Sequence, residues 1–264
     1  MMKTRILKFL TFSFIILFTI SCGDDDGEEV TVTPGLEDVE FAFSATEPPI
    51  DIQTAPLLQS SDPNANQVGI WISQTDFFSS FLENFQAPAG ATKSTTPIGG
   101  KSSKNGRTQE DVIVYTYTTT EGGTSISVAY QISETSTSYV FEIFWKFDGT
   151  DYIKFIHAEE SKDELRDGFM DIFPVDPGSE EDEDFFLRYE WSETATGLFT
   201  FKVFDVDEGF RLTIVSNPDN SGSLTVEFDG ILNYEATWNS DGTAGTYTTY
   251  DFDGNVISTG TWEI

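Results

Sequence analysis

Residues Leu224–Trp238, with the sequence LTVEFDGILNYEATW, decide the fold class of this chain. Apolar and polar residues alternate on both sides of Asp229-Gly230. A period of two puts the apolar residues on one face of a strand and the polar residues on the other, as an antiparallel sheet over a core requires. Asp-Gly suits a tight turn because glycine accepts positive φ. The stretch is therefore predicted to form a β-hairpin with one face on a core.

The same patterns continue over the chain after Asp111. Residues 125–132 alternate in the same way, whereas Tyr139–Phe147, Tyr152–Ile156 and Phe185–Trp191 are apolar at both alternating positions. These three runs are expected to lie deeper in the core or to face a ligand. Six dipeptides suit hairpin turns: Asn105-Gly106, Asp148-Gly149, Asp167-Gly168, Asp229-Gly230, Asp241-Gly242 and Asp253-Gly254.

The spacing of runs and turns predicts roughly ten to twelve strands after Asp111 with no helix between them, which excludes parallel crossovers. The predicted fold class is all-β, an antiparallel meander that forms a barrel or a two-sheet sandwich. Glycine and aromatic residues between Ala236 and Trp262 indicate a hairpin repeat of about 15–24 residues, in too few copies for a repeat protein.

One short amphipathic helix is predicted before the sheet, over residues 76–86, with Thr75 as its N-cap and Pro88 after its end. Its apolar residues fall on one side: Phe77, Phe78, Phe81, Leu82 and Phe85. We expect this side to pack on the core, although it could also bind a partner or a membrane. Val68–Ser73 is predicted to be a short strand.

The N-terminus has the pattern of a secretory signal. Three basic residues precede the uncharged run Phe9–Ile20, which is too short to cross a bilayer as a helix: Lys3, Arg5 and Lys8. Ser21, a small residue, stands directly before Cys22, the only cysteine of the chain. An ordinary signal peptide followed by a free cysteine is the alternative.

The Ser21-Cys22 junction resembles a bacterial lipoprotein signal, although Thr19 stands where that family usually has leucine. The resemblance implies cleavage before Cys22 and attachment of lipid, palmitate included, to the Cys22 thiol. The acidic cluster that follows resembles the surface-export signal of Bacteroidota-type lipoproteins: Asp24, Asp25 and Asp26. The expected location is the outer membrane, lipid-anchored at the cell surface, although an acidic run can also be a solvated tether.

Composition divides the chain into three parts. Residues 1–21 are the predicted signal peptide, residues 22–66 an acidic, proline-containing flexible tether, and residues 67–264 a single β domain. The formal charge of −31 would become −34 on cleavage, because three basic residues leave and no acid does. So acidic a surface repels phosphate backbones and excludes nucleic-acid binding. One cysteine and one histidine exclude an intramolecular disulfide and any site with several imidazoles.

Gly69-Ile70-Trp71 is similar to the opening motif of the lipocalin family, and a meander follows it. This resemblance covers three residues and implies a barrel that holds a ligand.

Two sets of residues are candidates for ligand binding. Trp71, Trp145 and Trp191 lie in or at the ends of predicted strands, where their rings could stack on a sugar or belong to the core. Residues 89–110 form a long Gly/Ser/Thr loop that concentrates basic side chains in a very acidic chain: Lys93, Lys101, Lys104 and Arg107. The loop could be an anion-facing lid for a charged glycan or an anionic lipid headgroup, or a soluble connector.

Calcium is the one metal that the composition permits, and no other cofactor is expected. Residues 217–224 are similar to the first eight positions of an EF-hand loop, with Asn217, Asp219 and Ser221 as candidate ligands. Phe228 stands where the bidentate glutamate belongs, so a β-turn is the simpler interpretation. His157, the only imidazole, is interpreted as a satisfied strand residue because no nucleophile motif accompanies it.

The expected function is non-catalytic binding of a glycan, a peptide or a small apolar ligand by a lipid-anchored surface protein. The alternatives are a carboxylate-based glycoside hydrolase and a structural or adhesion module. The oligomeric state stays open.

The lipid anchor gives a direct test. Cys22→Ala removes the only thiol that can be acylated, so the precursor should remain uncleaved by the lipoprotein peptidase and unlipidated. Intact mass and detergent partitioning check this expectation. Unchanged mass and partitioning in the variant would show that Cys22 carries no lipid.

Overall fold

The computed structural model describes Leu36, Val39, and residues 54–83, 87, 89–98, 112–121, 124–148, 150–163, 165–175 and 184–264. The signal segment, Cys22 and the acidic cluster Asp24–Asp26 lie outside the described residues, as do Lys101, Lys104 and Arg107. In the part of the chain that is described, no helix is both long enough and apolar enough to span a bilayer.

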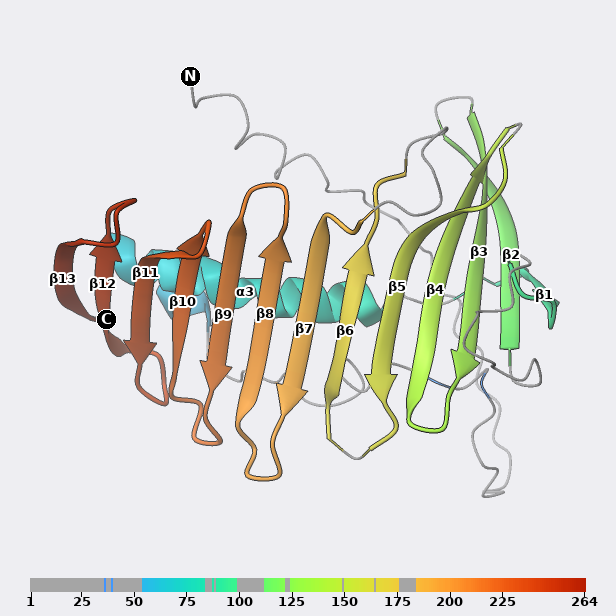
Figure 1. Ribbon diagram of the computed structural model, residues 1–264. Helices are drawn as coiled ribbons and strands as arrows, with labels where there is room; N and C mark the ends of the chain where they lie inside the picture. The colour runs from blue at the N-terminus through green and yellow to red at the C-terminus, as the bar shows by residue number, and fades with distance from the viewer. Residues whose placement is uncertain are drawn as a thin grey trace. The chain divides into compact units, whose positions relative to one another are not determined.

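In the described part of the chain, thirteen antiparallel strands form one sheet and follow one another in chain order, each beside the next (Figure 1). The strands are β1 (Thr92–Ser94), β2 (Val112–Glu121), β3 (Thr124–Glu134), β4 (Ser138–Phe147), β5 (Ile153–Ser161), β6 (Asp167–Ile172), β7 (Leu187–Glu193), β8 (Phe199–Asp205), β9 (Phe210–Ser216), β10 (Gly222–Phe228), β11 (Ile231–Trp238), β12 (Ala244–Tyr250) and β13 (Val256–Glu263). The predicted all-β antiparallel meander is confirmed. Among the described strands β1 and β13 do not pair with each other, so the sheet is not closed.

Two helices among the described residues precede the sheet, α2 (Thr54–Gln59) and α3 (Pro63–Glu83). Helix α3 runs across one face of the sheet, behind the strands in Figure 1. Asp62 caps α3, because its Oδ1 accepts hydrogen bonds from the amides of Asn64 (2.8 Å) and Ala65 (3.1 Å). Pro63 occupies the first helical position, where its missing N–H costs nothing.

The helix corrects three sequence predictions. It is longer than the predicted segment 76–86, and it includes Val68–Ser73, which was predicted to be a strand. Val68 and Ile72 are buried one turn apart on the side that continues to Phe78, so a helical period prevails over β-propensity. Thr75 is not a cap, since its buried hydroxyl donates to the carbonyl of Ile72 at 2.7 Å.

Gly69-Ile70-Trp71 therefore lies in the middle of a helix and does not open a strand, as a lipocalin motif would. A Cβ at position 69 would lie 2.8 Å from Cβ of Leu57 in α2, so glycine lets the two helices approach closely. The predicted domain boundary at residue 67 falls inside α3, and Leu57 and Ala65 before it are buried in the core.

An aromatic cluster joins α3 to the middle of the sheet. The ring centroid of Phe78 lies 4.4 Å from that of Tyr189, 5.4 Å from Trp191 and 5.5 Å from Phe201. Aromatic contacts of this kind add about 0.5–1.5 kcal/mol each beyond the area that they bury. Phe77, next in the chain, is 60% exposed, so the predicted apolar side of the helix includes Phe78 and Leu82 but not Phe77.

Glycine–tryptophan pairs recur between neighbouring strands on the core face. Gly168 is paired with Trp191, Gly222 with Trp238, and Gly245 with Trp262. In each pair the indole lies over the glycine, and at Gly168 a Cβ would meet Cζ2 of Trp191 at 2.6 Å. The absence of a side chain therefore makes room for the partner's ring.

These pairs correct one turn prediction, because Gly168 lies inside β6 and not in a hairpin turn. Asp229-Gly230, Asp241-Gly242 and Asp253-Gly254 do form turns, with φ of 77°, 71° and 80° at the glycines. An Asp-Gly dipeptide thus has two uses in this chain. The partner strand decides between them, and local sequence does not reveal that partner.

The glycine–tryptophan pairs can be tested at Gly222. Gly222→Ala forces a methyl group against the Trp238 ring and the carbonyl of Val215, so the variant should lose about 1–3 kcal/mol of unfolding free energy. Ser223→Ala, the next position in the same strand, should stay within about 0.5 kcal/mol of the parent. Urea unfolding followed by tryptophan fluorescence measures both. Equal stability of the two variants would contradict a packing role for the glycine.

Candidate functional site

The sheet face opposite α3 carries polar rows that cross strands β4 to β8. One row runs through paired neighbours in the order Glu142, His157, Asp171, Arg188 and Phe204. The next row follows the order Val140, Glu159, Phe169, Glu190 and Lys202. Beside it lie Ser138, Ser161, Asp167, Ser192 and Thr200. Strand pairing thus assembles on one surface residues that lie far apart in the chain.

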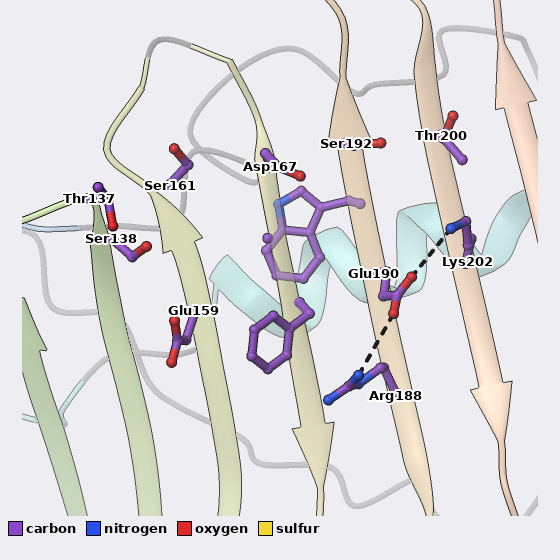
Figure 2. Close-up of a pocket in the computed structure, with 13 residues that line it drawn as sticks. Thr137, Ser138, Glu159, Ser161, Asp167, Arg188, Glu190, Ser192, Thr200 and Lys202 are labelled. Carbon is purple, nitrogen blue, oxygen red and sulfur yellow. Dashed lines mark hydrogen bonds and ion pairs between the residues drawn. The ribbon is translucent and has the colours of Figure 1, made fainter. Parts of the chain in front are cut away.

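A shallow groove of about 440 Å³ lies over these rows. Figure 2 shows its labelled side chains on the strands in front of α3. They extend from Thr137, in the turn before β4, and Ser138, at the start of β4, to Lys202 on β8. The groove is lined by Thr137, Ser138, Glu159, Ser161, Asp167, Gly168, Phe169, Arg188, Glu190, Trp191, Ser192, Thr200 and Lys202. Hydroxyl groups and charged groups dominate this lining, with the half-buried ring of Phe169 among them.

Arg188 is held in place on this face. Its Nε and Nη2 donate to the two carboxylate oxygens of Asp171, at 2.5 and 2.7 Å. Its guanidinium also contacts two rings, 4.9 Å from the centroid of Phe169 and 4.3 Å from that of Phe185. The hydrogen bond to Asp171 raises the pKa of Arg188, so the group stays charged. A bidentate pair flanked by rings positions the guanidinium rigidly.

Glu190 lies between two cations in the groove. Its Oε1 is 3.9 Å from Nη1 of Arg188, and its Oε2 is 3.4 Å from Nζ of Lys202 (Figure 2, dashed lines). Each carboxylate oxygen of Glu190 thus faces one cation. The two ion pairs hold this glutamate in place as a hydrogen-bond acceptor in the groove.

His157 lies beside the groove, bound between two glutamates. Its Nδ1 is 3.3 Å from Oε1 of Glu142, and its Nε2 is 3.3 Å from Oε1 of Glu159. Burial works against the charged imidazole, but the hydrogen bonds to both glutamates outweigh it and raise the pKa of His157. The interpretation of His157 as a satisfied strand residue is confirmed, although it lies on the polar face, with the ring centroid of Phe169 5.8 Å away.

Glu142 has three partners. Lys154 is 3.0 Å away, His157 contacts the same oxygen, and the amide of Gln131 donates to Oε2 at 2.7 Å. Burial raises the pKa of Glu142, but the contacts with His157 and Lys154 prevail and lower it to about 2. The residues around His157 thus form a paired charge cluster on strands β3 to β5.

The tryptophans do not form the expected aromatic platform. Trp191 is only 2% exposed and donates through Nε1 to the buried carboxylate of Glu160 at 3.2 Å. Trp71, on α3, stacks on Phe210 with 5.6 Å between the ring centroids. Trp145 packs on Phe155 with 4.5 Å between the ring centroids. Trp191 is thus a core residue that lies over Gly168, whereas Trp71 and Trp145 are partly buried and pack against the core.

The predicted basic loop contains a strand. Lys93 lies in β1 and is paired with Tyr115 of β2. Lys101, Lys104 and Arg107 fall outside the described residues, so a lid remains a prediction.

The calcium candidates form a hydrogen-bonded turn between β9 and β10. Oδ1 of Asp219 accepts bonds from the amide (3.0 Å) and hydroxyl (2.6 Å) of Ser221, whose hydroxyl also accepts from Asn217 at 3.0 Å. Asn220 supplies the positive φ, 66°, that glycine supplies in the later turns. In the turn at Asn239–Thr243 the amide and hydroxyl of Thr243 donate to Oδ1 of Asp241 in the same way. The oxygens of residues 217–221 are therefore arranged as in an ordinary hairpin turn. Within the described residues no cluster of three or more His, Cys, Asp or Glu side chains is arranged to hold a metal.

Comparison of the chain with protein-family models, with curated proteins and with solved structures gives no match. Function can therefore be inferred only from the residues of this chain.

Sequence reasoning missed Phe169, Arg188, Glu190 and Lys202 as groove residues. One signal was present, since basic residues are rare in this chain (14 of 264) and two of them occupy the interiors of neighbouring strands. A cation inside a strand needs an anionic partner on the same face.

Stability should depend on pH through the charge cluster at His157. The native state favours the charged imidazole, so its contribution is complete below the ordinary pKa of 6.5 and is lost as pH rises through the raised pKa. The lowered pKa of Glu142 has the opposite sign, with a contribution complete above 4.5 and lost as pH falls toward about 2. The cluster should therefore stabilise the fold most between pH 4.5 and 6.5.

Urea unfolding at about pH 5.5 and about pH 8 tests this expectation, since the two values lie on either side of the ordinary histidine pKa. The difference in unfolding free energy between parent and His157→Gln should shrink at the higher pH. Arg211→Gln is the control, because it removes an exposed ion pair in which Nη1 of Arg211 lies 3.6 Å from Oε2 of Glu227. Its deficit in unfolding free energy should be the same at both pH values. An equal deficit of His157→Gln at both pH values would show that folding does not raise the pKa of His157.

Proposed function

We propose that this chain is a non-catalytic binding protein, anchored by a lipid on Cys22 at the outer membrane and displayed on the cell surface, whose groove over β4–β8 binds a glycan. The observation that carries the binding role is the composition of that groove. Hydroxyl side chains, fixed charged pairs and the half-buried ring of Phe169 surround about 440 Å³ on the open face of the sheet.

The polar lining supports a ligand that is rich in hydroxyl groups. Ser138, Ser161, Ser192 and Thr200 each offer one donor and two acceptor positions. The ring of Phe169 offers an apolar surface among them. A sugar combines hydroxyl groups with apolar C–H surface, whereas a small apolar ligand would leave these hydroxyls without partners.

The charges of the groove favour a neutral glycan over an acidic one. Arg188 and Lys202 are bound to Asp171 and Glu190, and the lining also contains Glu159 and Asp167. A sulfate or carboxylate would have to displace these partners or approach further acids. A neutral hydroxyl group can instead accept from a cation and donate to a carboxylate at the same time.

The arrangement favours binding over hydrolysis. A glycosidase needs one carboxylic acid that is protonated in the resting enzyme and a second carboxylate across the scissile bond. Glu190 is flanked by Arg188 and Lys202, and Asp171 is paired bidentately with Arg188. Both carboxylates are thus occupied by cations of this face, and neither can act on a scissile bond without losing its ion-pair partner.

The surface location rests on the N-terminal sequence. The basic residues, the short apolar run and the Ser21-Cys22 junction support export and lipidation. Asp24, Asp25 and Asp26 support display on the outer face.

Glycan binding can be tested with a panel of neutral and anionic oligosaccharides and calorimetry on the hits. Phe169→Ala should weaken binding about tenfold, equivalent to about 1.4 kcal/mol. Ser192→Ala combined with Thr200→Val should lose about 1 kcal/mol per hydroxyl that contacts the sugar.

Phe204→Ala is the matched control. Phe204 lies on the same face of β8, contacts Arg211 at 4.9 Å and does not line the groove, so its loss should leave affinity unchanged. Equal loss in Phe169→Ala and Phe204→Ala would place the ligand elsewhere. Release of reducing sugar from any bound oligosaccharide would show an enzyme in place of a binding protein.

A further inference from the structure

The last strand, β13, is an edge without the usual protection. Among the described strands it pairs only with β12, so one side of its backbone keeps unpaired N–H and C=O groups. In natural proteins an edge strand is protected from further pairing by lysine or proline residues, by its short length or by a bulge. β13 contains no lysine and no proline, and from Ser258 to Glu263 it pairs regularly with β12. Its single bulge is confined to the start of the strand, where Ile257 has no partner in β12.

Apolar side chains flank this regular segment at both ends. Ile257 before it is 67% exposed, Val256 is 59% exposed, and Ile264 after it is 46% exposed. Exposed Val and Ile next to a free edge are the features that sheet proteins usually avoid. The opposite edge, β1, is three residues long and carries Lys93 at its centre.

Charge indicates which partner this edge fits. β12 is the only described strand without Asp, Glu, Lys or Arg, and β13 has only Glu263. A cationic partner would bind the acidic surfaces of this chain, whose net charge is −31, and not this nearly uncharged edge. Two copies of this chain repel each other over most of their surfaces, and they do so least where β12 and β13 form an uncharged end of the sheet.

We propose that β13 pairs with β13 of a second copy of this chain, antiparallel about a two-fold axis through Thr261, whose N–H and C=O point away from β12. This register places Ile264 of one copy opposite Ser258 of the other, beside Ile257, at both ends of the pairing. It also places Glu263 opposite Thr259, so no like charges face each other. The arrangement is self-complementary, as a two-fold interface must be, and it extends the meander across both copies.

The interface is small, because only the seven residues Ser258–Ile264 of each chain form the ladder. Such a contact lies below the standard size of stable complexes, so the dimer should be weak and concentration-dependent. Salt should strengthen it, since screening reduces the repulsion between two acidic copies while backbone hydrogen bonds are little affected.

Sedimentation velocity of the full chain between about 1 μM and about 1 mM covers the range of weak dimers. The parent should dimerise with rising concentration, and more readily at high salt. A variant with Ile257→Lys and Ile264→Lys should lose at least about tenfold in affinity. The two added positive charges change its net charge from −31 to −29 and so reduce the repulsion between copies. Long-range repulsion therefore cannot explain a loss of affinity in this variant.

Ile70→Lys with Phe77→Lys is the matched control, because it makes the same change of charge at exposed apolar positions of α3. This control should dimerise like the parent. Mixing the double lysine variant with a second variant, Ile257→Glu and Ile264→Glu, should restore association as a heterodimer. The outward-facing backbone amides of Thr259, Thr261 and Glu263 should become protected from hydrogen exchange as the parent dimerises, whereas those of Ser258, Gly260 and Trp262 already face β12.

A monomer at every concentration and salt would overturn the proposal. So would a dimer that the control pair abolishes and the edge pair leaves intact, since α3 would then form the interface. Dimerisation without added protection in β13, or without rescue in the mixture, would refute the edge pairing and its register.

Discussion

The contact of Phe78 with Tyr189, Trp191 and Phe201 is the interaction on which the rest of the structure depends. In a meander each strand touches only its neighbours in the chain, so the strands alone leave one apolar face without cover. Helix α3 covers that face, and Phe78 brings it against β7 and β8. With one face buried in this way, the other face is free to carry polar groups.

The glycine–tryptophan pairs let the core face lie close beneath the helix. Each indole lies over a strand position without a side chain, so large rings are accommodated within the sheet's own surface. At Gly168 this arrangement has a consequence for the groove on the other face. Trp191 borders the groove and yet remains almost fully buried, while Phe169, next to the glycine, points the other way.

The open face is organised by strand pairing. Arg188, Asp171 and His157 belong to three successive strands and lie in one row because those strands are in register. A shift of one residue in any of these pairings would move the charges to the core face. The apolar core therefore positions the proposed binding surface, and the charged pairs hold it without forming the core themselves.

The sequence by itself determined the fold class, because alternation and turn residues are local properties. Leu224–Trp238 predicted a hairpin, and the structure has β10 and β11 joined at Asp229-Gly230. The interpretation of Asn217, Asp219 and Ser221 as a turn was also available from local chemistry.

Only the tertiary structure decided what lies against what. The pattern at Val68–Ser73 fits a strand or a buried helix equally well, and packing against the sheet selected the helix. Gly168 looks like a turn residue until its pairing with Trp191 is known. The groove depends on the register of five strands, and a register is a relation between distant segments that no local pattern contains.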